Sequence, residues 1–366
     1  MLITGGAGFI GVNAARYFIA RGWDVTIFDN FSRRGTEYNV EKLTDDCHGR
    51  FAVVRGDTRS DVRLLQSLAE RADVILHLAA QVAVTTSVTD PRTDFDCNAL
   101  GTFNVLEAAR LSTTRPAVLY ASTNKVYGAL EDLPVLELAQ RYAFAGDRTG
   151  VSEAQPLDFH SPYGCSKGAA DQYVRDYARI YGLKTVVFRQ SCIYGPHQMG
   201  VEDQGWVAWF LIAGLFGRPV QIYGNGKQVR DLLYVEDLVR CYEQAIDRID
   251  QVAGKVFNLG GGAENTLSLL EFFALLEREH GITLSSSFAS VRPGDQPIFV
   301  SDNSAALRDL QWKPSVGVHA GITQLLAWLR DHQQDLAAFY SSEKESMLTR
   351  TLKRVLRSSR VAPQNV

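Results

Sequence analysis

The sequence predicts an α/β protein built on a Rossmann-type, doubly wound parallel sheet with a smaller α/β substrate-binding lobe. Short apolar runs alternate with helical patterns from the N-terminus onward, which is typical of βαβ units with right-handed crossovers. Wholly apolar strands such as residues 74–79 suit a sheet that helices cover on both faces. Finally, a glycine-rich turn at residues 4–11 separates the first strand from the first helix, as in dinucleotide-binding folds.

The individual elements follow from the apolar runs and their periodicity. We expect strands at residues 2–4, 23–29, 51–55, 74–79, 117–121 and 185–189, and helices near residues 10–21, 98–110 and 164–181. Residues 232–246 are expected to return to the main sheet as a strand and a helix. Polar residues 131–158 are expected to form an irregular insertion, and a connection of that length within a domain is usually functional.

Composition excludes several classes of protein. The 366 residues are 46% hydrophobic and 22% charged, which is ordinary for a globular chain. A formal net charge of −3 gives no electrostatic support for nucleic-acid binding. Five cysteines without a Cys-x-x-Cys pair predict free thiols in a reducing compartment, with no metal site. Because we find neither a transmembrane run nor a signal peptide, we expect a cytoplasmic protein.

The glycine-rich turn has the residues that a dinucleotide site requires. Gly5 permits the tight turn, Gly8 leaves room for a pyrophosphate, and Gly11 allows the helix to pack closely on the strand. The first helix then directs its free N–H groups at the phosphates. Asp29 follows about 20 residues later, at the end of the second strand, where an acid accepts hydrogen bonds from the adenosine ribose.

The charge of Asp29 favours NAD over NADP, because a carboxylate repels a 2′-phosphate. NADP remains the alternative cofactor, because arginines in that loop, such as Arg33 and Arg34, can hold a 2′-phosphate. Asp57 is placed to meet the adenine, although an aspartate there also suits a helix N-cap. Besides Tyr163 and Lys167, the other residues expected to contact the cofactor are Phe9, Ile10, Asn30, Ser32, Arg33, Thr58, Leu78, Ala79, Ala80, Gln81, Asn98, Ala121, Ser122, Gln190 and Cys192.

A second group of residues suits hydride-transfer chemistry. Tyr163 and Lys167 are four residues apart on one helix and therefore share a face. Thr123 closes the strand at 117–121, at the sheet edge where catalytic groups collect. Oxidising a carbinol requires a base, and a tyrosine with an ordinary pKa of about 10 needs activation. We expect the Lys167 ammonium and a positive nicotinamide to lower the pKa of Tyr163 towards neutrality.

These motifs, in this order, resemble those of the extended short-chain dehydrogenase/reductase family, among its NAD-dependent epimerases and dehydratases. The resemblance covers about residues 1–330 and is carried by TGGAGFIG at 4–11, HLAAQ at 77–81, STNKVYG at 122–128, SPYGCSK at 161–167 and RPGD at 292–295. It implies a nucleotide-sugar substrate, a tightly held NAD, and catalytic roles for Thr123, Tyr163 and Lys167. It also implies a homodimer or homotetramer, with the helices near residues 98–110 and 164–181 as candidate contacts. The alternative is that the protein's own core covers the apolar faces of these helices.

Longer segments resemble the nucleotide-sugar 2-epimerases of that family. They lie at residues 81–87, 122–128, 158–173, 203–210 and 224–238. This resemblance implies an isomerase that inverts C2 of CDP-paratose or a related CDP-hexose, in CDP-tyvelose and lipopolysaccharide O-antigen biosynthesis. Oxidation would give a keto-sugar, which is re-reduced on its other face. A 4-epimerase acting on a UDP- or other nucleotide-hexose shares every catalytic residue and remains the alternative.

The same resemblance implies the substrate contacts. Arg230 and Arg292 would clamp the diphosphate, a role that suits planar, permanently charged guanidinium groups. The substrate-binding residues expected are Thr85, Thr123, Gln198, Gln204, Gly205, Tyr223, Gln228, Arg230, Arg292 and Asp295. Sugar dehydratases of the family place Asp-Glu after the catalytic threonine, whereas Asn124 and Lys125 follow it here, so dehydration is disfavoured.

Two further questions stay open at this stage. One interpretation gives His160 a catalytic role beside Tyr163, but a structural histidine in a loop is the simpler interpretation. A non-catalytic NAD-binding protein is a competing class, although such a protein would be expected to have lost the base.

The domain boundaries follow from the change of pattern after residue 190. We expect the NAD-binding domain at residues 1–190, completed by about 230–260, and the substrate-binding lobe at 191–229 and 261–335. Residues 336–366 are expected to form a basic C-terminal tail. Its weakly amphipathic pattern suits either a helix at an anionic membrane or a partner, or a solvated tail.

Overall fold

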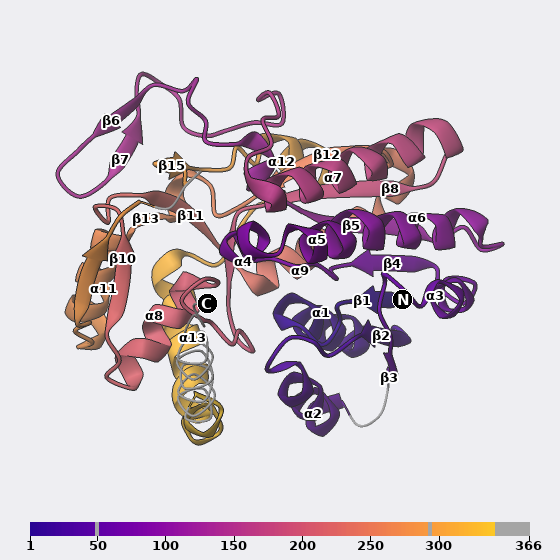
Figure 1. Cartoon of the computed structure of the whole chain (residues 1–366), viewed down its shortest axis with the longest axis horizontal. Coiled ribbons are helices and arrows are strands. Elements are labelled where there is room, and N and C mark those ends of the chain that lie inside the picture. Colours follow the sequence, from indigo (N-terminus) through magenta and orange to yellow (C-terminus); the bar gives the residue numbers. More distant parts are fainter. Residues whose placement is uncertain (48–50, 292–294, 341–366) are drawn as a thin grey trace, which may run out of the picture.

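The chain is organised around a parallel sheet of seven strands, with a smaller lobe beside it (Figure 1). The computed structural model describes residues 1–47, 51–291 and 295–340. The sheet has the order β12-β8-β5-β4-β1-β2-β3. Its strands are β1 (Leu2–Thr4), β2 (Val25–Asp29), β3 (Phe51–Arg55), β4 (Val74–His77), β5 (Ala117–Thr123), β8 (Thr185–Gln190) and β12 (Val256–Leu259). All adjacent pairs are parallel, so the predicted fold class is confirmed.

Helices cover both faces of this sheet, as its wholly apolar strands predict. One layer comprises α1 (Phe9–Ala20), α2 (Thr36–Cys47), α9 (Val235–Asp247), α10 (Ile249–Val252) and α12 (Ser304–Leu310). The opposite layer comprises α3 (Val62–Ala69), α4 (Val84–Thr89), α5 (Pro91–Phe95), the π-helix η1 (Asp96–Leu100), α6 (Gly101–Leu111) and α7 (Ser161–Tyr181).

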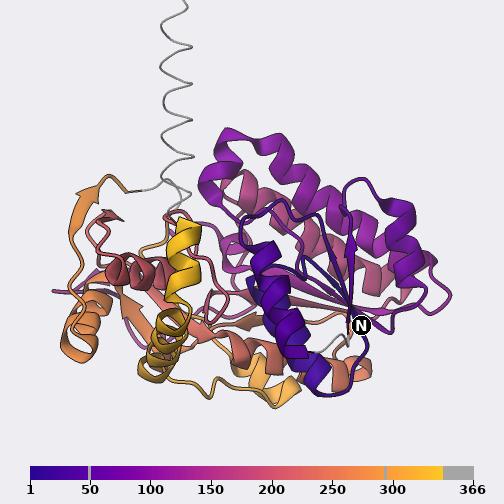
Figure 2. The same cartoon turned by 90° about the horizontal axis from the view of Figure 1, so that it is seen from below.

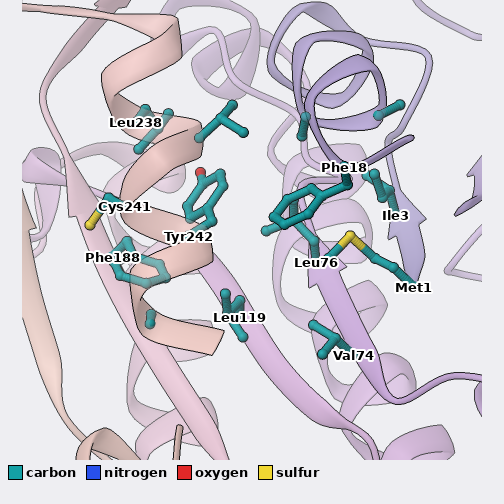
Figure 3. Packing of buried hydrophobic residues seen from close by; sticks show 14 of the residues in the cluster. Met1, Ile3, Phe18, Val74, Leu76, Leu119, Phe188, Leu238, Cys241 and Tyr242 are labelled. Carbon is teal, nitrogen blue, oxygen red and sulfur yellow. The ribbon is translucent and has the colours of Figure 1, made fainter. Parts of the chain in front are cut away.

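Alternating residues of each strand contribute side chains to two separate cores, one on each face of the sheet. In the first core, Phe18 of α1 and Tyr242 of α9 pack on strand residues that include Ile3 and Leu119 (Figure 3). In the second, side chains of α3, α6 and α7 pack on the opposite faces of the same strands, including Leu2. The period-2 pattern of the strands thus fixes the sheet between two helical layers.

The smaller lobe contains mixed strands and its own apolar core. Its four-stranded sheet consists of β9 (Cys192–Tyr194), β11 (Val229–Tyr234), β13 (Thr266–Ser268) and β15 (Ile298–Phe299). It also contains the pair β10 (Val220–Tyr223) and β14 (Ser286–Ala289), and the helices α8 (Trp206–Leu215), α11 (Leu269–His280), α13 (Val318–Asp331) and η3 (Ala263–Asn265). From below, this lobe lies to one side of the parallel sheet (Figure 2).

Two local structures complete the described chain. The short 3₁₀ helix η2 (Asn124–Tyr127) follows β5 directly, and the insertion at 131–158 contains the hairpin β6 (Val135–Glu137) and β7 (Tyr142–Phe144). None of the helices in the described part of the chain combines the length and apolarity that a membrane crossing requires.

The expected return of residues 232–246 to the main sheet is only half right. Helix α9 does pack on that sheet through Tyr242. Strand β11, however, pairs with β9, β13 and β15 in the smaller lobe, and β12 is the strand that extends the main sheet. The apolar run at 232–234 predicts a buried strand, but a run alone does not identify the sheet that the strand joins.

The predicted tail boundary at residue 336 is also wrong. Residues 333–340 are helical, and Leu336 and Tyr340 are buried in the core of the smaller lobe. The Tyr340 hydroxyl donates a hydrogen bond to the Gly200 carbonyl at 2.8 Å. Apolar side chains therefore fix this segment to the lobe, and the weakly amphipathic pattern of 341–366 lies outside the described residues.

His77 makes the stability of the fold depend on pH. Its ring nitrogens lie 2.6 Å from Thr4 Oγ1 and 2.9 Å from Thr102 Oγ1, and the residue is 1% exposed. Burial, with the charge of Lys167, lowers the pKa of His77 to about 3. The unfolded chain therefore takes up a proton below about pH 6.5 that the folded chain excludes.

We expect stability to fall as the pH drops below about 6.5, with His77 contributing up to about 1.4 kcal/mol per pH unit. Urea unfolding of wild type and His77→Asn at several pH values measures this contribution. The variant is expected to lose stability with a shallower slope, and parallel slopes would contradict the assignment.

Candidate active site

The candidate site lies at the carboxyl ends of the parallel strands, where β1 has β2 on one side and β4 on the other. The chain continues from β1 to β2 and β3 on one side and then crosses to β4 on the other side. Ligands bind at this reversal of strand order in open α/β sheets. The glycine turn follows β1, Ala79 follows β4, and Thr123 ends β5. The three segments predicted separately from the sequence therefore meet at one sheet edge.

The glycine turn has the close approaches that a cofactor cradle requires. Gly5 has a φ of +68°, and a Cβ built on it would lie 2.6 Å from the Ala79 nitrogen. A Cβ on Gly11 would lie 2.5 Å from the Gly5 carbonyl oxygen, inside any real contact distance. Gly8 is the N-cap of α1 in an extended conformation, with no side chain above the free N–H groups of the helix. These residues fit a dinucleotide pyrophosphate.

We expect Gly11→Ala to bind NAD weakly, because the added methyl group must push the glycine turn away from α1. Cofactor retained after gel filtration, measured by absorbance and enzymatic assay, reports the change. Gly317→Ala is a matched control, because Gly317 has a φ of −69° and the built Cβ meets only Asn265 Oδ1, at 3.9 Å. Equal NAD content in Gly11→Ala and wild type would contradict the role of the turn.

Backbone groups of the glycine turn and of the loop after β2 hold the Asp29 side chain in place. Its carboxylate accepts hydrogen bonds from the backbone N–H groups of Ala7 at 3.1 Å and Phe31 at 2.8 Å. Burial raises the pKa of Asp29, and these two N–H groups partly offset that effect. The side chain is thereby fixed at the end of β2 beside the glycine turn, where a ribose diol would lie.

Asp57 is not the N-cap of α3, which is instead Asp61. The Asp57 carboxylate accepts from Asn30 Nδ2 at 2.9 Å and forms an ion pair with Arg59 at 2.7 Å. The Arg59 hydrogen bonds lower the pKa of Asp57 to about 2. Of the two interpretations left open by the sequence, helix capping is therefore wrong. The bond from Asn30 joins the ends of β2 and β3 on the predicted adenosine side.

The two arginines of the loop after β2 differ in surroundings. The Arg34 guanidinium donates to the Phe339 carbonyl and stacks on the Phe339 ring. Arg33 lines a small pocket together with Gly8 and Phe9. Arg34 lines the same pocket, so both arginines lie near the glycine turn.

Several other predicted cofactor contacts use their side chains within the protein. Gln81 Nε2 and Asn98 Nδ2 both donate to the buried Asp94 carboxylate at 3.1 Å. Ser122 donates to Asp171 at 2.8 Å. Gln190 Nε2 donates to the hydroxyl of Tyr242. These side chains therefore shape the walls of the site.

The proposed catalytic side chains converge at the end of β5. Thr123, Tyr163 and Lys167 are 7%, 8% and 3% exposed. Pro162 in the first turn begins α7 at Ser161, so Tyr163 lies in that first turn, and its backbone N–H donates to Ser87 Oγ at 3.1 Å. The Thr123 hydroxyl is near enough to Tyr163 to lower the pKa of the phenol.

Lys167 is held one turn further along α7. Its ammonium donates to the Ala121 carbonyl at 2.6 Å and lies 4.3 Å from the centre of the Tyr120 ring. Burial lowers the pKa of Lys167 to about 7, and the nearby Asp171 and Asp94 carboxylates partly offset this effect. The lysine is therefore anchored to β5 at the base of the site.

The expected lowering of the Tyr163 pKa depends on Lys167 together with a positive nicotinamide, and Lys167 alone does not produce it. Burial raises the pKa of Tyr163 to about 12, and the Thr123 hydroxyl offsets only part of that increase. Removing water from around the phenol disfavours its anionic form. A bound positive nicotinamide would supply the charge that counters desolvation.

A cavity of about 830 Å³ lies next to this region. Lys125 and Ser161, each two residues from a catalytic residue in sequence, line it, whereas Thr123, Tyr163 and Lys167 themselves do not. Of the predicted substrate residues, it is lined by Thr85, Tyr223, Gln228, Arg230 and Asp295. Apolar side chains form much of its wall, namely Val82, Val84, Val88, Phe159, Trp206, Phe210 and Leu269. His160 also lines it and lies 3.0 Å from Asp158.

The remaining predicted substrate residues lie elsewhere. Gln198 and Gln204 line the small pocket that faces Gly8 and Arg33, so they contact the cofactor side. Gly205 caps α8 with a φ of +72°. Arg292 lies outside the described residues. Within the described residues, no cluster of His, Cys, Asp and Glu side chains could hold a metal ion.

Sequence reasoning missed two groups near the site. Lys125 lines the large cavity, a position that its place directly after Thr123 could have suggested. Arg189 and Asp171 form a fully buried ion pair at 2.9 Å beneath the catalytic helix. An arginine in the otherwise apolar strand TVVFRQ is a signal that a buried carboxylate lies opposite.

Comparison with known proteins agrees with this geometry. The NAD dependent epimerase/dehydratase family matches residues 1–260. CDP-paratose 2-epimerase of Salmonella typhi is 44% identical over 334 residues, covering 90% of this chain and 98% of that protein. UDP-glucose 4-epimerase of Mycolicibacterium smegmatis is 32% identical, covering 91% and 99%.

Solved structures give the same result. A dTDP-glucose 4,6-dehydratase from Streptomyces venezuelae, solved with NAD bound, superposes with a TM-score of 0.79 at 27% identity, covering 92% of this chain and 99% of that one. UDP-glucose 4-epimerase of Thermotoga maritima superposes with a TM-score of 0.77 at 28% identity, covering 91% and 99%. The chain belongs to the NAD dependent epimerase/dehydratase family. Within that family it is an epimerase, and its sequence is more similar to the 2-epimerase than to these 4-epimerases.

Proposed function

We propose that this enzyme inverts C2 of a CDP-linked hexose, with CDP-paratose as its substrate. The observation that carries this proposal is the 44% identity to CDP-paratose 2-epimerase over nearly the whole length of both chains. The site supports it, because a tyrosine, a threonine and a lysine converge beside a cavity large enough for a nucleotide sugar. A place in O-antigen sugar biosynthesis would follow from that substrate.

Each catalytic side chain has a defined task in this proposal. NAD, which the glycine turn and Asp29 would hold, would supply the hydride acceptor for oxidation and the hydride donor for re-reduction. Tyr163 takes the proton of the sugar hydroxyl as the carbinol is oxidised, and it gives the proton back after inversion. Thr123 orients the same oxygen through its hydroxyl. Lys167, anchored at the Ala121 carbonyl, provides positive charge that favours the phenolate and holds the nicotinamide ribose.

The cavity wall suits the inversion step. A keto-sugar must present its opposite face before hydride returns, so the ring has to reorient without leaving. Phe159, Trp206 and Phe210 offer apolar surface with no directional hydrogen bonds to the ring. The described residues near Thr123 include no carboxylate pair for eliminating water, because Asn124 and Lys125 follow it.

Product analysis by NMR tests this function. Purified enzyme with bound NAD is incubated with CDP-paratose, and the sugar ring protons are followed. We expect inversion confined to C2, with no net formation of NADH. Inversion of C4 in UDP-glucose, with no change in CDP-paratose, would replace the proposal by the 4-epimerase alternative.

We further propose that the enzyme is a homodimer or homotetramer packed through α6 and α7. Exposed apolar side chains lie on these neighbouring helices, including Phe103 at 39%, Tyr173 at 52% and Ile180 at 66%. Phe103 and Tyr173 contact each other edge-to-face across the two helices. Sedimentation equilibrium measures the assembly, and a monomer at micromolar concentration would contradict it. The five free cysteines suit a cytoplasmic enzyme.

A further inference from the structure

A charged cluster lies at one end of the large cavity. Asp295 Oδ1 is 2.6 Å from the Arg230 guanidinium and 3.6 Å from Lys125 Nζ, and all three residues line the cavity. Arg230 also donates to the carbonyls of Val229 and Gln296, both at 2.8 Å. Two cations therefore share one carboxylate.

Lys125 lines this cavity from η2, the short helix that directly follows Thr123 at the end of β5. Its backbone N–H donates to Thr123 Oγ1 at 3.2 Å. Its carbonyl oxygen lies 3.4 Å from the position of a Cβ on Gly164, the residue after Tyr163. Helix η2 is thus packed between the end of β5 and the start of α7, and Lys125 is a near neighbour of both reacting groups.

The position of Lys125 suits the phosphate of a nucleotide sugar. The diphosphate is attached at C1, one bond away from C2, whereas C4 lies on the far side of the ring. An enzyme that presents C2 to Thr123 and Tyr163 must therefore hold a phosphate close to these residues. Arg230 and Lys125 offer positive charge at that place, and cations are the groups that bind phosphate oxygens most strongly.

We propose that Lys125 binds the sugar-linked phosphate of the substrate and, together with Arg230, places the diphosphate beside Thr123 and Tyr163, so that C2 faces the base. This inference deepens the proposed function and rests on its substrate class. Asp295 positions both cations in the absence of substrate. Lys125 is accordingly a specificity-determining residue, since its charge lies where only a carbon adjacent to C1 brings a phosphate.

Titration of Lys125 distinguishes binding from a structural role. Burial and the charge of Arg230 lower the pKa of Lys125 to about 8, while Asp295 offsets part of the shift. The other charged or titratable groups that line the cavity are His160, Glu202, Asp203 and Tyr223. The Lys125 cation is present below about pH 8 and is lost above it, whereas phosphate is fully ionised throughout that range, with a pKa of about 6.

Calorimetric binding of CDP, UDP and dTDP to the NAD-containing enzyme tests this proposal, with the matching nucleosides as controls. We expect Lys125→Met to weaken diphosphate binding about 10- to 100-fold at neutral pH and to leave nucleoside binding unchanged. Wild-type affinity is expected to fall above about pH 8. Lys125→Arg should retain affinity there, because arginine keeps its charge. Lys255→Met, which removes an exposed lysine paired with Asp309, is the control for loss of one charge.

The outcomes separate this inference from the proposed function. Equal diphosphate affinity in Lys125→Met and wild type, or an unchanged fall of affinity at high pH in that variant, would overturn the role of Lys125 alone. Diphosphate binding that depends on Lys125, without sugar inversion, would support the phosphate contact and overturn the epimerase proposal. A wild-type enzyme that binds none of the three diphosphates would overturn both.

Discussion

Tyr163→Phe is expected to lower kcat by about 10³-fold or more while the protein stays folded and retains NAD. The substitution removes only the phenolic oxygen, which is the proposed acceptor of the sugar hydroxyl proton. Its ring remains buried at the start of α7, so packing is preserved. Single-turnover reduction of bound NAD, followed by absorbance, measures the oxidation step directly.

Tyr177→Phe is the matched control for this substitution. It removes a phenolic oxygen from the same helix, where the hydroxyl donates to Glu107 at 2.7 Å, away from the cavity. We expect nearly wild-type turnover from this variant. Wild-type activity in Tyr163→Phe would remove the tyrosine from the mechanism, whatever the product stereochemistry.

Asp171→Asn is expected to cause the largest loss of stability, about 3–5 kcal/mol, because it leaves the Arg189 cation buried without its counter-ion. The pair is bidentate, with both hydrogen bonds at 2.9 Å, and Arg189 also donates to the Tyr127 hydroxyl. Since Asp171 accepts from Ser122 beside Thr123, activity should fall as well. The midpoint of urea unfolding measures the effect on stability.

Two further variants identify the cause of that loss. Asp250→Asn removes one carboxylate from an exposed ion pair with Lys184, and we expect a loss below about 1 kcal/mol. Asp171→Leu combined with Arg189→Met removes both buried charges, so it should recover much of the stability lost by Asp171→Asn. A double variant that is less stable than the single one would contradict the unpaired-charge explanation.

Features defined by short-range spacing could be predicted from the sequence. The glycine turn, Asp29 and the pair Tyr163 and Lys167 depend on neighbouring residues in one strand, turn or helix. Their meeting point then follows from strand order, because the carboxyl ends of β1, β4 and β5 share one edge. The family resemblance and the fold class rest on the same local signals.

Features that depend on distant contacts could not be predicted. The apolar run in β11 indicates burial but does not identify the partner strands of the smaller lobe. Desolvation governs the pKa of Tyr163, and its extent becomes visible only when the surrounding chain is placed. The cluster of Lys125 and Asp295 likewise joins segments far apart in sequence, so spacing alone does not reveal it.

The fate of the C2 hydrogen distinguishes most directly whether one carbon is oxidised and re-reduced by the same bound cofactor. CDP-paratose is converted in D₂O by enzyme with bound NAD, and the product is analysed by NMR. We expect inversion at C2 with the original hydrogen retained there, because the hydride returns from the cofactor. Incorporation of solvent deuterium at C2 would indicate deprotonation of that carbon and would contradict oxidation and re-reduction by the cofactor.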